Sequence, residues 1–282
     1  MTRLTAEADR TQIQIATGKK LLAPSDDPGA YLRLQGISRQ TADDGTYAAN
    51  IGMAQGLLAQ TDTTLESVEA QLTRALELAT QASNGTLSDT NRAAIGKELD
   101  SIRDTLFALA NTRDVRGQPL FGGATGDTAY LRNPDGSIAP AGTGEPSAIP
   151  IGEGVGIQGT VTGTRAFAAG SSDMFAVLAD LAAALETGGD VKAAADAGRA
   201  GIKASLESVT LARASAGARS ARLELDTDRL TAAGEAREDV RSALEDTDVT
   251  VAVTELQKTL TILQATQASF SKLSSLSLFD YL

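Results

Sequence analysis

The residues best suited to catalysis or metal binding are missing from this sequence. Its 282 residues include no His and no Cys. His is the commonest general base and metal ligand, and the Cys thiolate is a nucleophile and a zinc ligand. Hydrolase triads, zinc–thiolate sites and disulfide frameworks are therefore excluded. Only carboxylate, Lys or Tyr chemistry remains open.

Two acidic clusters could bind a cation or form an acid pair. Asp26 and Asp27 precede Pro28, and Asp246-Thr247-Asp248 lies near the other end of the chain. Asp is a favoured N-cap and Pro suits the first helical position, so we expect Asp27 to cap a helix. We expect the second cluster to mark a break between helices. The sequence thus predicts no catalytic residue, no metal site and no cofactor, with a carboxylate enzyme as an alternative.

The middle of the chain raises two other possibilities. Gly152-Glu153-Gly154-Val155-Gly156 is as rich in glycine as a phosphate loop, but no helix with Lys-Ser/Thr follows it, and Glu153 would repel phosphate. We expect a turn between two strands there. Tyr130 and Phe167 could stack on a sugar, as in an adhesin or carbohydrate-binding module. That alternative requires both rings to be exposed.

The charge and hydropathy of the chain exclude further classes. Lys and Arg number 25 against 36 Asp and Glu, which gives a net charge of −11. A nucleic-acid binder or an anionic-membrane binder needs a basic face, so both are disfavoured. No stretch reaches the ~18 apolar residues of a membrane span, and the first residues lack the apolar segment of a secretory signal. A secreted protein of this kind would need export without a cleaved signal.

Prolines and glycines divide the chain into helical ends and a middle insert. Five of the 7 prolines and 13 of the 27 glycines fall within residues 117–170. Because Pro breaks helix interiors, the two stretches without Pro can hold long helices. We expect helices at residues 29–83 and 191–245, each spanning ~80 Å at 1.5 Å per residue. Shorter helices are expected before Gly18, from Ser88 to about Arg113, from a cap at Ser172 to Gly188, and after Asp248.

Apolar residues recur every seven positions along both long helices, which is the spacing of a coiled-coil seam. The three series are Ile51, Leu58, Leu65, Leu72 and Ala79; Ala54, Thr61, Val68, Ala75 and Ala82; and Ile202, Val209, Ala216, Leu223 and Leu230. They predict a mainly α fold, an elongated antiparallel helical bundle or coiled coil built from both chain ends. A small β-rich outer domain is inserted in the middle.

The two chain ends carry apolar seams with no obvious partner of equal length. The predicted assembly seam comprises Leu4, Ile13, Ile15, Val249, Val253, Leu256, Leu260, Leu263, Phe270, Leu273 and Leu276. The only antiparallel partner of the last helix within the chain is the short first helix. We therefore predict that other copies of the chain complete these seams.

Eight glycines lie inside the two long helices, and each costs about 1 kcal/mol relative to Ala. They are Gly36, Gly45, Gly52, Gly56, Gly198, Gly201, Gly217 and Gly234. Our hypothesis is that close helix–helix approach within a polymer offsets this cost.

The linker after the first helix resembles a known family. Residues 12–20, followed by Pro24-Ser25-Asp26-Asp27-Pro28, resemble the N-terminal signature of bacterial flagellins and their hook-associated relatives, with Gly18 as part of the motif. Residues 82–89, 109–112, 117–123 and 213–224 resemble further segments of these proteins. The ending, residues 260–282, is more similar to the hook–filament junction members than to the flagellins.

The resemblance implies a three-part organisation. Residues 1–20 and 247–282 would form terminal coiled-coil segments of an inner tube, residues 21–121 and 171–246 a long-helix bundle, and residues 122–170 the outer domain. Family members usually carry more residues before the motif, so the inner N-terminal helix is expected to be short here.

The resemblance also implies a function. The chain would be a non-enzymatic structural subunit joining the flagellar hook to the filament, with flagellin as the alternative. The implied partners are other copies in a ring, a neighbouring hook-associated protein, flagellin, and an export chaperone on the C-terminal helix. No nucleic acid and no membrane insertion are implied. The expected location is the extracellular flagellum, reached by type III export without a cleaved signal.

Overall fold

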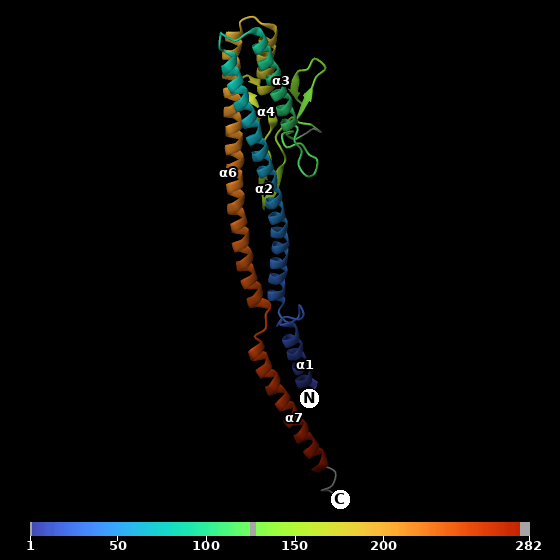
Figure 1. The fold of residues 1–282 in the computed structure, drawn as a ribbon. Coiled ribbons are helices and arrows are strands. Elements are labelled where there is room, and N and C mark those ends of the chain that lie inside the picture. Colours follow the sequence, from blue (N-terminus) through green and yellow to red (C-terminus); the bar gives the residue numbers. More distant parts are fainter. Residues whose placement is uncertain (1, 125–127, 277–282) are drawn as a thin grey trace. The chain divides into compact units, whose positions relative to one another are not determined.

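The chain forms two compact units in the computed structural model shown in Figure 1. The structure describes residues 2–124 and 128–276, and the side chains as far as residue 273. The terminal unit consists of Met1–Gly45 and Leu230–Leu282, and the central unit of Thr46–Arg229. Both long helices pass from one unit into the other, so the unit boundaries do not coincide with helix breaks.

The helices occur where the prolines and glycines predict them. Their bounds are α1 Thr2–Thr17, α2 Pro28–Ala82, α3 Asp89–Ala110, α4 Gly163–Ala166, α5 Met174–Thr187, α6 Val191–Glu245 and α7 Val249–Leu276. The two long helices, α2 and α6, have 55 residues each. The prediction of a mainly α fold with two long Pro-free helices is confirmed.

The helix ends show which capping predictions hold. Gly18, with a φ of 72°, follows α1, and Gly188, with a φ of 83°, follows α5. Ser88 caps α3 by accepting a hydrogen bond from the Asn91 N–H. The predicted Ser172 cap of α5 is wrong, because the carboxylate of Asp173 accepts from two N–H groups at the start of that helix while Ser172 lies in a strand. The negative charge of this carboxylate also interacts favourably with the positive end of the helix dipole.

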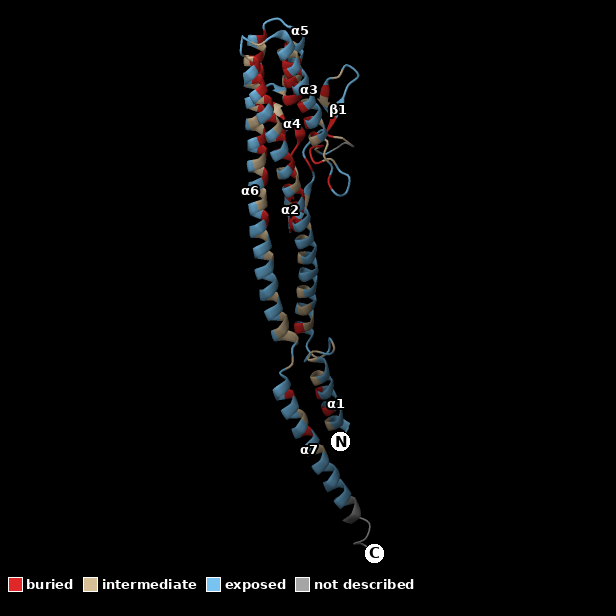
Figure 2. Cartoon of the chain, viewed as in Figure 1, coloured by how far each residue is buried: buried red, intermediate tan, exposed pale blue. Residues whose placement is uncertain are grey.

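The predicted heptad residues are buried in the central unit, except Leu230, which is half-buried and belongs to the terminal unit. Every member of the first two series is at most 2% exposed, as are Ile202, Val209, Ala216 and Leu223 of the third. The core continues on α3 and α5, with Leu99, Leu106 and Leu178 fully buried. Figure 2 colours these buried residues red. The coiled-coil interpretation of both long helices is therefore confirmed, and the seam serves as an ordinary core within one chain.

Two of the helix glycines are explained within the chain. A Cβ on Gly198 would lie 2.8 Å from Cδ2 of Leu181 in α5, and a Cβ on Gly201 would lie 2.7 Å from Val177. For these two positions the polymer hypothesis is wrong, since the close approach is between α6 and α5. The other six predicted glycines, Gly36, Gly45, Gly52, Gly56, Gly217 and Gly234, have no heavy atom within 4 Å of that position.

Two Ala substitutions should distinguish a glycine that is packed against α5 from a glycine in open space. Gly198→Ala is expected to destabilise the central unit by about 1–3 kcal/mol, because the added methyl overpacks a buried Leu181. Gly217→Ala is expected to stabilise it by up to about 1 kcal/mol, since Ala is the better helix former and the site is open. Urea unfolding measures both. Equal effects of the two substitutions would contradict this account.

The middle segment forms three separate two-stranded antiparallel ladders. They are β1 Tyr130–Arg132 with β2 Ile138–Pro140, β3 Ala148–Gly152 with β4 Val155–Gln158, and β5 Ala168–Ala169 with β6 Ser172–Asp173. The first hairpin is closed by the predicted turn, in which the Gly136 N–H donates to Asn133 O at 3.0 Å. Gly154, with a φ of 67°, lies between β3 and β4, which confirms a connecting turn there.

The aromatic residues of this segment are buried, so the requirement for the sugar-stacking alternative fails. Tyr130 is 2% exposed and Phe167 is 0% exposed. The Phe167 ring centroid lies 4.8 Å from that of Phe121, 5.8 Å from that of Tyr130 and 6.5 Å from that of Phe175. Burial also raises the pKa of Tyr130. These four rings attach the β-rich segment to α5 as a shared core.

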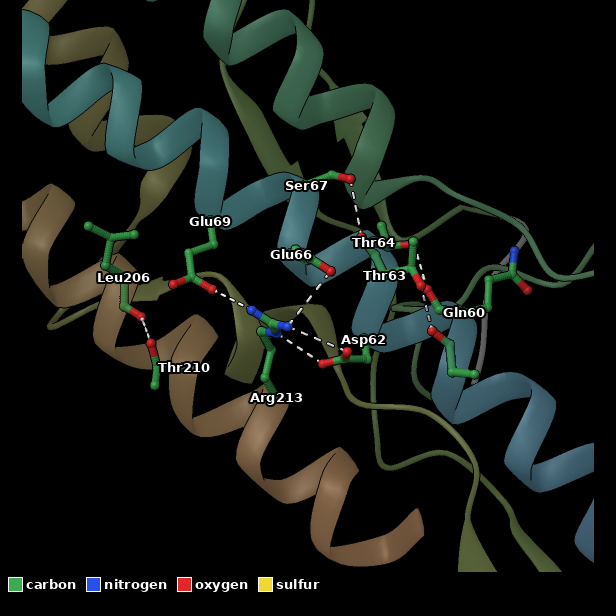
Figure 3. A network of polar contacts seen from close by, with 11 residues as sticks. Gln60, Asp62, Thr63, Thr64, Glu66, Ser67, Glu69, Leu206, Thr210 and Arg213 are labelled. Carbon is green, nitrogen blue, oxygen red and sulfur yellow. Dashed lines mark hydrogen bonds and ion pairs between the residues drawn. The ribbon is translucent and has the colours of Figure 1, made fainter.

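Two arginines of α6 fix its position in the central unit. Arg213 donates from Nε to Oδ1 of Asp62 at 2.9 Å and from Nη1 to Oε2 of Glu69 at 2.7 Å (Figure 3), and these carboxylates raise its pKa. Arg219 donates to the carbonyl oxygens of Gln158 at 3.1 Å and Thr160 at 2.8 Å. Arg213 thus fixes the axial position of α6 along α2. Arg219 holds the end of β4 on α6.

Candidate assembly surface

In the terminal unit, α1 and α7 pack against each other through small residues. The buried residues are Ala8 and Thr11 on α1, and Ala252 and Thr259 on α7. Small side chains allow two helices to approach closely. The buried Thr11 hydroxyl is satisfied, because it donates to Glu7 O at 2.9 Å.

Some of the predicted seam residues lie in the contact between α1 and α7, and others lie exposed beside it. Leu4 and Ile15 of α1 are half-buried, as are Leu256 and Leu263 of α7. Together with Ala252 and Thr259, the last two follow a spacing of four, three and four residues along α7. This spacing places one line of α7 against α1.

Several seam residues remain exposed beside that line. Val249, Val253 and Leu260 on one flank of α7 are 49%, 37% and 40% exposed, and Ile13 on α1 is 50% exposed. Ile13 lies two residues from Ile15, so the helical period turns it away from the face that packs on α7. These residues are available for contact with another molecule.

The opposite flank of α7 is apolar as well, and sequence reasoning missed it. Val251 and Ile262 are 64% and 42% exposed. They are eleven residues apart, which is about three helical turns. A search for apolar residues spaced eleven apart, rather than seven apart, would have found Val251 and Ile262. A helix that is apolar on more than one side is typical of a buried position, so α7 has the composition of a helix with neighbours on both flanks.

The far end of α7 extends beyond the described residues of α1. α1 has 16 described residues and α7 has 28. The Thr247 N–H donates to Gly18 O at 2.8 Å, so the end of α1 lies beside the start of α7 and the helices are antiparallel. Phe270 and Leu273, 63% and 67% exposed, lie further along α7 than 16 residues reach. The side chain of Leu276 lies outside the described residues, and its role stays a prediction.

The motif residues build the linker between α1 and α2. Pro24 and Ser25 form a turn, and the Asp26 carboxylate accepts from the N–H groups of Leu22 at 2.9 Å and Ala23 at 3.0 Å. These backbone hydrogen bonds lower the pKa of Asp26. Asp27 accepts from the Ala30 N–H at 2.9 Å, with Pro28 as the first residue of α2. The capping interpretation of Asp27 is confirmed, and Asp26 closes the preceding turn.

The second linker, between α6 and α7, is joined to the first. The Lys20 N–H donates to Glu245 O at 2.7 Å, and Lys19 forms an ion pair with the Glu245 carboxylate. Asp248 caps α7 by accepting from the Thr250 N–H at 2.9 Å. The acidic cluster is therefore a helix break, as predicted. The two linkers hold α1 and α7 side by side at their adjacent ends.

Acid is expected to loosen this junction. The hydrogen bond from Lys19, with one from Arg241, lowers the pKa of Glu245. A carboxyl group with a lowered pKa stabilises the folded state above the ordinary Glu value of about 4.3 and loses that contribution as pH falls. Exchange protection of the Lys20 and Thr247 amides should be constant from about pH 7 to 5 and fall below that range. Glu245→Gln should remove this dependence, and equal protection at pH 3 and 6 in the unmodified chain would refute it.

A groove in the terminal unit adds apolar surface near this junction. It has a volume of about 610 Å³ and is lined on one side by Leu21, Tyr31, Leu34 and Ile37. Arg241 lines its other side and forms ion pairs with Glu238 and Glu245. Sequence reasoning missed the groove because its residues come from a linker and from the ends of two helices.

The described residues were searched for a metal-ligand cluster and for a membrane-spanning helix. Across residues 2–124 and 128–276, no three acidic side chains gather as metal ligands would. In the same ranges, every helix is too short or too polar to span a membrane. Apolar helix surface is the main feature that the terminal unit offers to a partner.

Comparison with known proteins identifies the family. The models of the bacterial flagellin N-terminal and C-terminal helical regions match residues 1–125 and 200–282. Flagellar hook-associated protein 3 of Escherichia coli is 30% identical, and that of Salmonella typhimurium 31%, each alignment covering 95% of this chain and 90% of the relative. The chain belongs to the flagellar hook-associated protein 3 family.

A solved structure and a flagellin complete the comparison. A putative flagellar hook-associated protein from Vibrio parahaemolyticus has the same fold, with a TM-score of 0.73, 24% identity, and coverage of 78% of this chain and 100% of that one. Flagellin A of Vibrio cholerae matches only 46% of this chain and 34% of its own length, at 28% identity. The resemblance to hook-associated protein 3 thus extends over nearly the whole chain, whereas the match to flagellin is partial. Membership of this family makes the chain a component of the bacterial flagellum.

Proposed function

We propose that this chain is a non-enzymatic structural subunit that joins the flagellar hook to the filament. The observation that carries the proposal is the apolar surface on both flanks of α7, in a member of the hook-associated protein 3 family. A catalytic role would require a cluster of reactive groups, whereas an assembly role requires unpaired apolar helix surface. The terminal unit provides unpaired apolar helix surface.

The proposed mechanism is ordering of the terminal helices on assembly into a ring. Val249, Val253 and Leu260 on one flank, and Val251 and Ile262 on the other, become buried against neighbouring copies. Apolar burial contributes about 25 cal/mol per Å², while ordering flexible termini costs about 2–5 kcal/mol. The far end of α7, with the exposed Phe270 and Leu273, also becomes buried in the assembly. A neighbouring hook-associated protein and flagellin would meet the two ends of the ring.

The same surface explains why export would need a chaperone. The proposed route is type III export in an unfolded state without a cleaved signal, ending in the extracellular flagellum. Exposed apolar surface of the kind present on α7 promotes aggregation before assembly. A chaperone that covers α7 until export would prevent this.

Deletion of the gene in a motile host tests the proposed function. The expected result is a non-motile cell with intact hooks that releases unpolymerised flagellin, and the unmodified gene should restore filaments. A deletion strain that still builds filaments on its hooks would contradict the proposal.

The alternative, a flagellin, is distinguished by the length of the polymer. Seeded assembly of a junction subunit should stop at a short ring, whereas a flagellin should extend into a long filament. Electron microscopy of the seeds separates these outcomes. Long filaments built from this chain alone would favour the flagellin alternative.

A further inference from the structure

The turn between α2 and α3 contains the only Asn–Gly pair of the sequence, Asn84-Gly85. Asn84, Gly85 and Thr86 are all exposed. No heavy atom lies within 4 Å of the position where a Cβ on Gly85 would stand, so this residue is open to water. Because glycine has no side chain, its backbone nitrogen can closely approach the side chain of the preceding Asn.

The side-chain amide of Asn84 is held over Gly85 by two hydrogen bonds from Thr86. The Thr86 hydroxyl donates to Oδ1 of Asn84 at 2.9 Å, and the Thr86 N–H donates to the same oxygen at 3.2 Å. A backbone N–H can only donate, so the atom that it contacts is the amide oxygen and not Nδ2. Two donors that meet at one carbonyl oxygen stabilise negative charge that develops on that oxygen.

The N–H group of Gly85 has no hydrogen-bond acceptor within residues 2–124 and 128–276. Its neighbours are engaged, because the Asn84 N–H donates to Gln81 O at 3.1 Å and the Leu87 N–H donates to Asn84 O at 3.3 Å. These two bonds fix the turn on both sides of Gly85. The Gly85 nitrogen is therefore free to lose its proton and act as a nucleophile, next to an amide whose oxygen already has two donors.

We propose that Asn84 is a modification site of the folded chain, at which it deamidates through a succinimide ring formed with Gly85. Hydroxide removes the Gly85 amide proton, the nitrogen forms a bond to Cγ of Asn84, and the carbonyl electron pair moves to Oδ1. Thr86 donates to the oxygen that gains this charge. The electron pair then returns to re-form the carbonyl, the Cγ–Nδ2 bond breaks, and Nδ2 takes a proton from water and leaves as ammonia.

Water completes the reaction by opening the ring at either of its carbonyl carbons. Attack at Cγ leaves an aspartyl residue at position 84. Attack at the backbone carbon leaves an isoaspartyl residue, in which the main chain runs through Cβ and Cγ. The net reaction consumes one water and releases one ammonia, so it needs no oxidant, enzyme or cofactor.

Both products change the turn between α2 and α3. Each adds a negative charge just beyond the end of α2, where the negative end of the helix dipole disfavours it. The isoaspartyl form also lengthens the main chain between the two helices by one methylene group. The inference concerns the single chain and is independent of the proposed assembly function.

A second turn provides a comparison, because Asp135-Gly136-Ser137 repeats the arrangement with Asp in place of Asn. The Ser137 hydroxyl and N–H donate to Oδ1 of Asp135 at 2.7 and 2.9 Å. Here the Gly136 N–H is engaged, since it donates to Asn133 O at 3.0 Å. The hydrogen bonds from Ser137 also lower the pKa of Asp135, and an ionised carboxylate is a poor target for a nucleophile. We therefore expect no succinimide at this turn under the same conditions.

Mass spectrometry of the folded full-length chain tests the site itself. The chain is incubated at mildly alkaline and at mildly acidic pH and then digested with trypsin. The tryptic peptide of residues 75–92 contains both Asn84 and Asn91, so Asn91 is an internal control. Asn84 should deamidate at least about tenfold faster than Asn91, and faster at the alkaline pH, because the Gly85 nitrogen must lose its proton. Equal rates at the two asparagines would overturn the proposal.

Removal of the Thr86 hydroxyl tests its contribution to the rate. Thr86→Val keeps the shape of the side chain, and we expect it to slow deamidation by about three- to tenfold, the effect of one net hydrogen bond on a rate. Thr86→Ser keeps the hydroxyl and should react as fast as the unmodified chain. An unchanged or faster rate in Thr86→Val would refute the role of Thr86.

Asp135→Asn tests whether the structure or the dipeptide alone sets the rate. It places a second Asn–Gly pair in the same molecule, with matching donors from Ser137 but with the Gly136 N–H engaged. In the folded chain this site should react several-fold more slowly than Asn84. In urea, where both turns are lost, the two rates should converge. Equal rates in the folded chain would refute the role of the free Gly85 N–H.

Discussion

Leu260→Asp is expected to abolish self-assembly while leaving the folded single chain intact. Leu260 is 40% exposed on one flank of α7, so in the isolated chain the new carboxylate remains in water. In the assembly the same position is buried against a neighbour, and burying an unpaired charge costs several kcal/mol. A loss of about 3 kcal/mol corresponds to association weakened by roughly 100-fold or more. Sedimentation velocity over a concentration series measures this change, and urea unfolding shows whether the fold is preserved.

Thr261→Asp provides the matched control for this substitution. Thr261 is the next residue of α7, is exposed, and turns away from the flank that holds Leu260. It should assemble as the unmodified chain does. Should Leu260→Asp also associate normally, the flank formed by Val249, Val253 and Leu260 would have no part in assembly.

Phe167→Ala is expected to cause the largest loss of stability in the central unit. Phe167 is fully buried, and its ring contacts three other aromatic rings, those of Phe121, Tyr130 and Phe175. Truncation of a buried Phe typically costs about 3–5 kcal/mol, because it removes apolar burial and leaves a cavity. Because this ring joins the β-rich segment to α5, the segment should also lose its protection against proteolysis. Urea unfolding and limited proteolysis measure the two effects.

Phe270→Ala gives the opposite pattern with the same change of side chain. Phe270 is 63% exposed at the far end of α7, so its truncation should change the stability of the single chain by less than about 0.5 kcal/mol. It should instead weaken assembly. A large stability loss for Phe270→Ala, or none for Phe167→Ala, would contradict the assignment of the first ring to the surface and the second to the core.

The long helices and their shared core could be predicted because their signals are local and repeated. Pro is absent from two long stretches, and the heptad series repeats over five positions in each, so single exceptions matter little. Ile51 and Ala79, at the two ends of one series, are both buried as the period requires. The resemblance to the flagellin superfamily relied in part on the linker residues, whose local roles the structure shows. Asp26 closes a turn and Asp27 caps α2.

The parts that could not be predicted depend on contacts between distant segments. Tyr130 begins the short strand β1 and Phe167 lies between α4 and β5, and the local sequence gives no sign that either is buried. Packing on α5 encloses them. Gly198 approaches Leu181 because of the angle between α5 and α6, which no periodicity encodes. On α7, the line that packs on α1 contains Ala252 and Thr259, whose small side chains give a weak apolar signal. A search for large apolar residues therefore found one flank of α7 and, of its contact line, only Leu256 and Leu263.

Hydrogen exchange on the full chain, before and after assembly, tests the central claim most directly. The claim is that neighbouring copies complete the apolar surface of α7. In the dilute single chain, the α7 amides from Val249 to Leu273 should exchange much faster than those in the buried heptads of α2. In the assembly their protection should rise to a similar level. Strong protection of α7 in the single chain, or no change on assembly, would contradict the account.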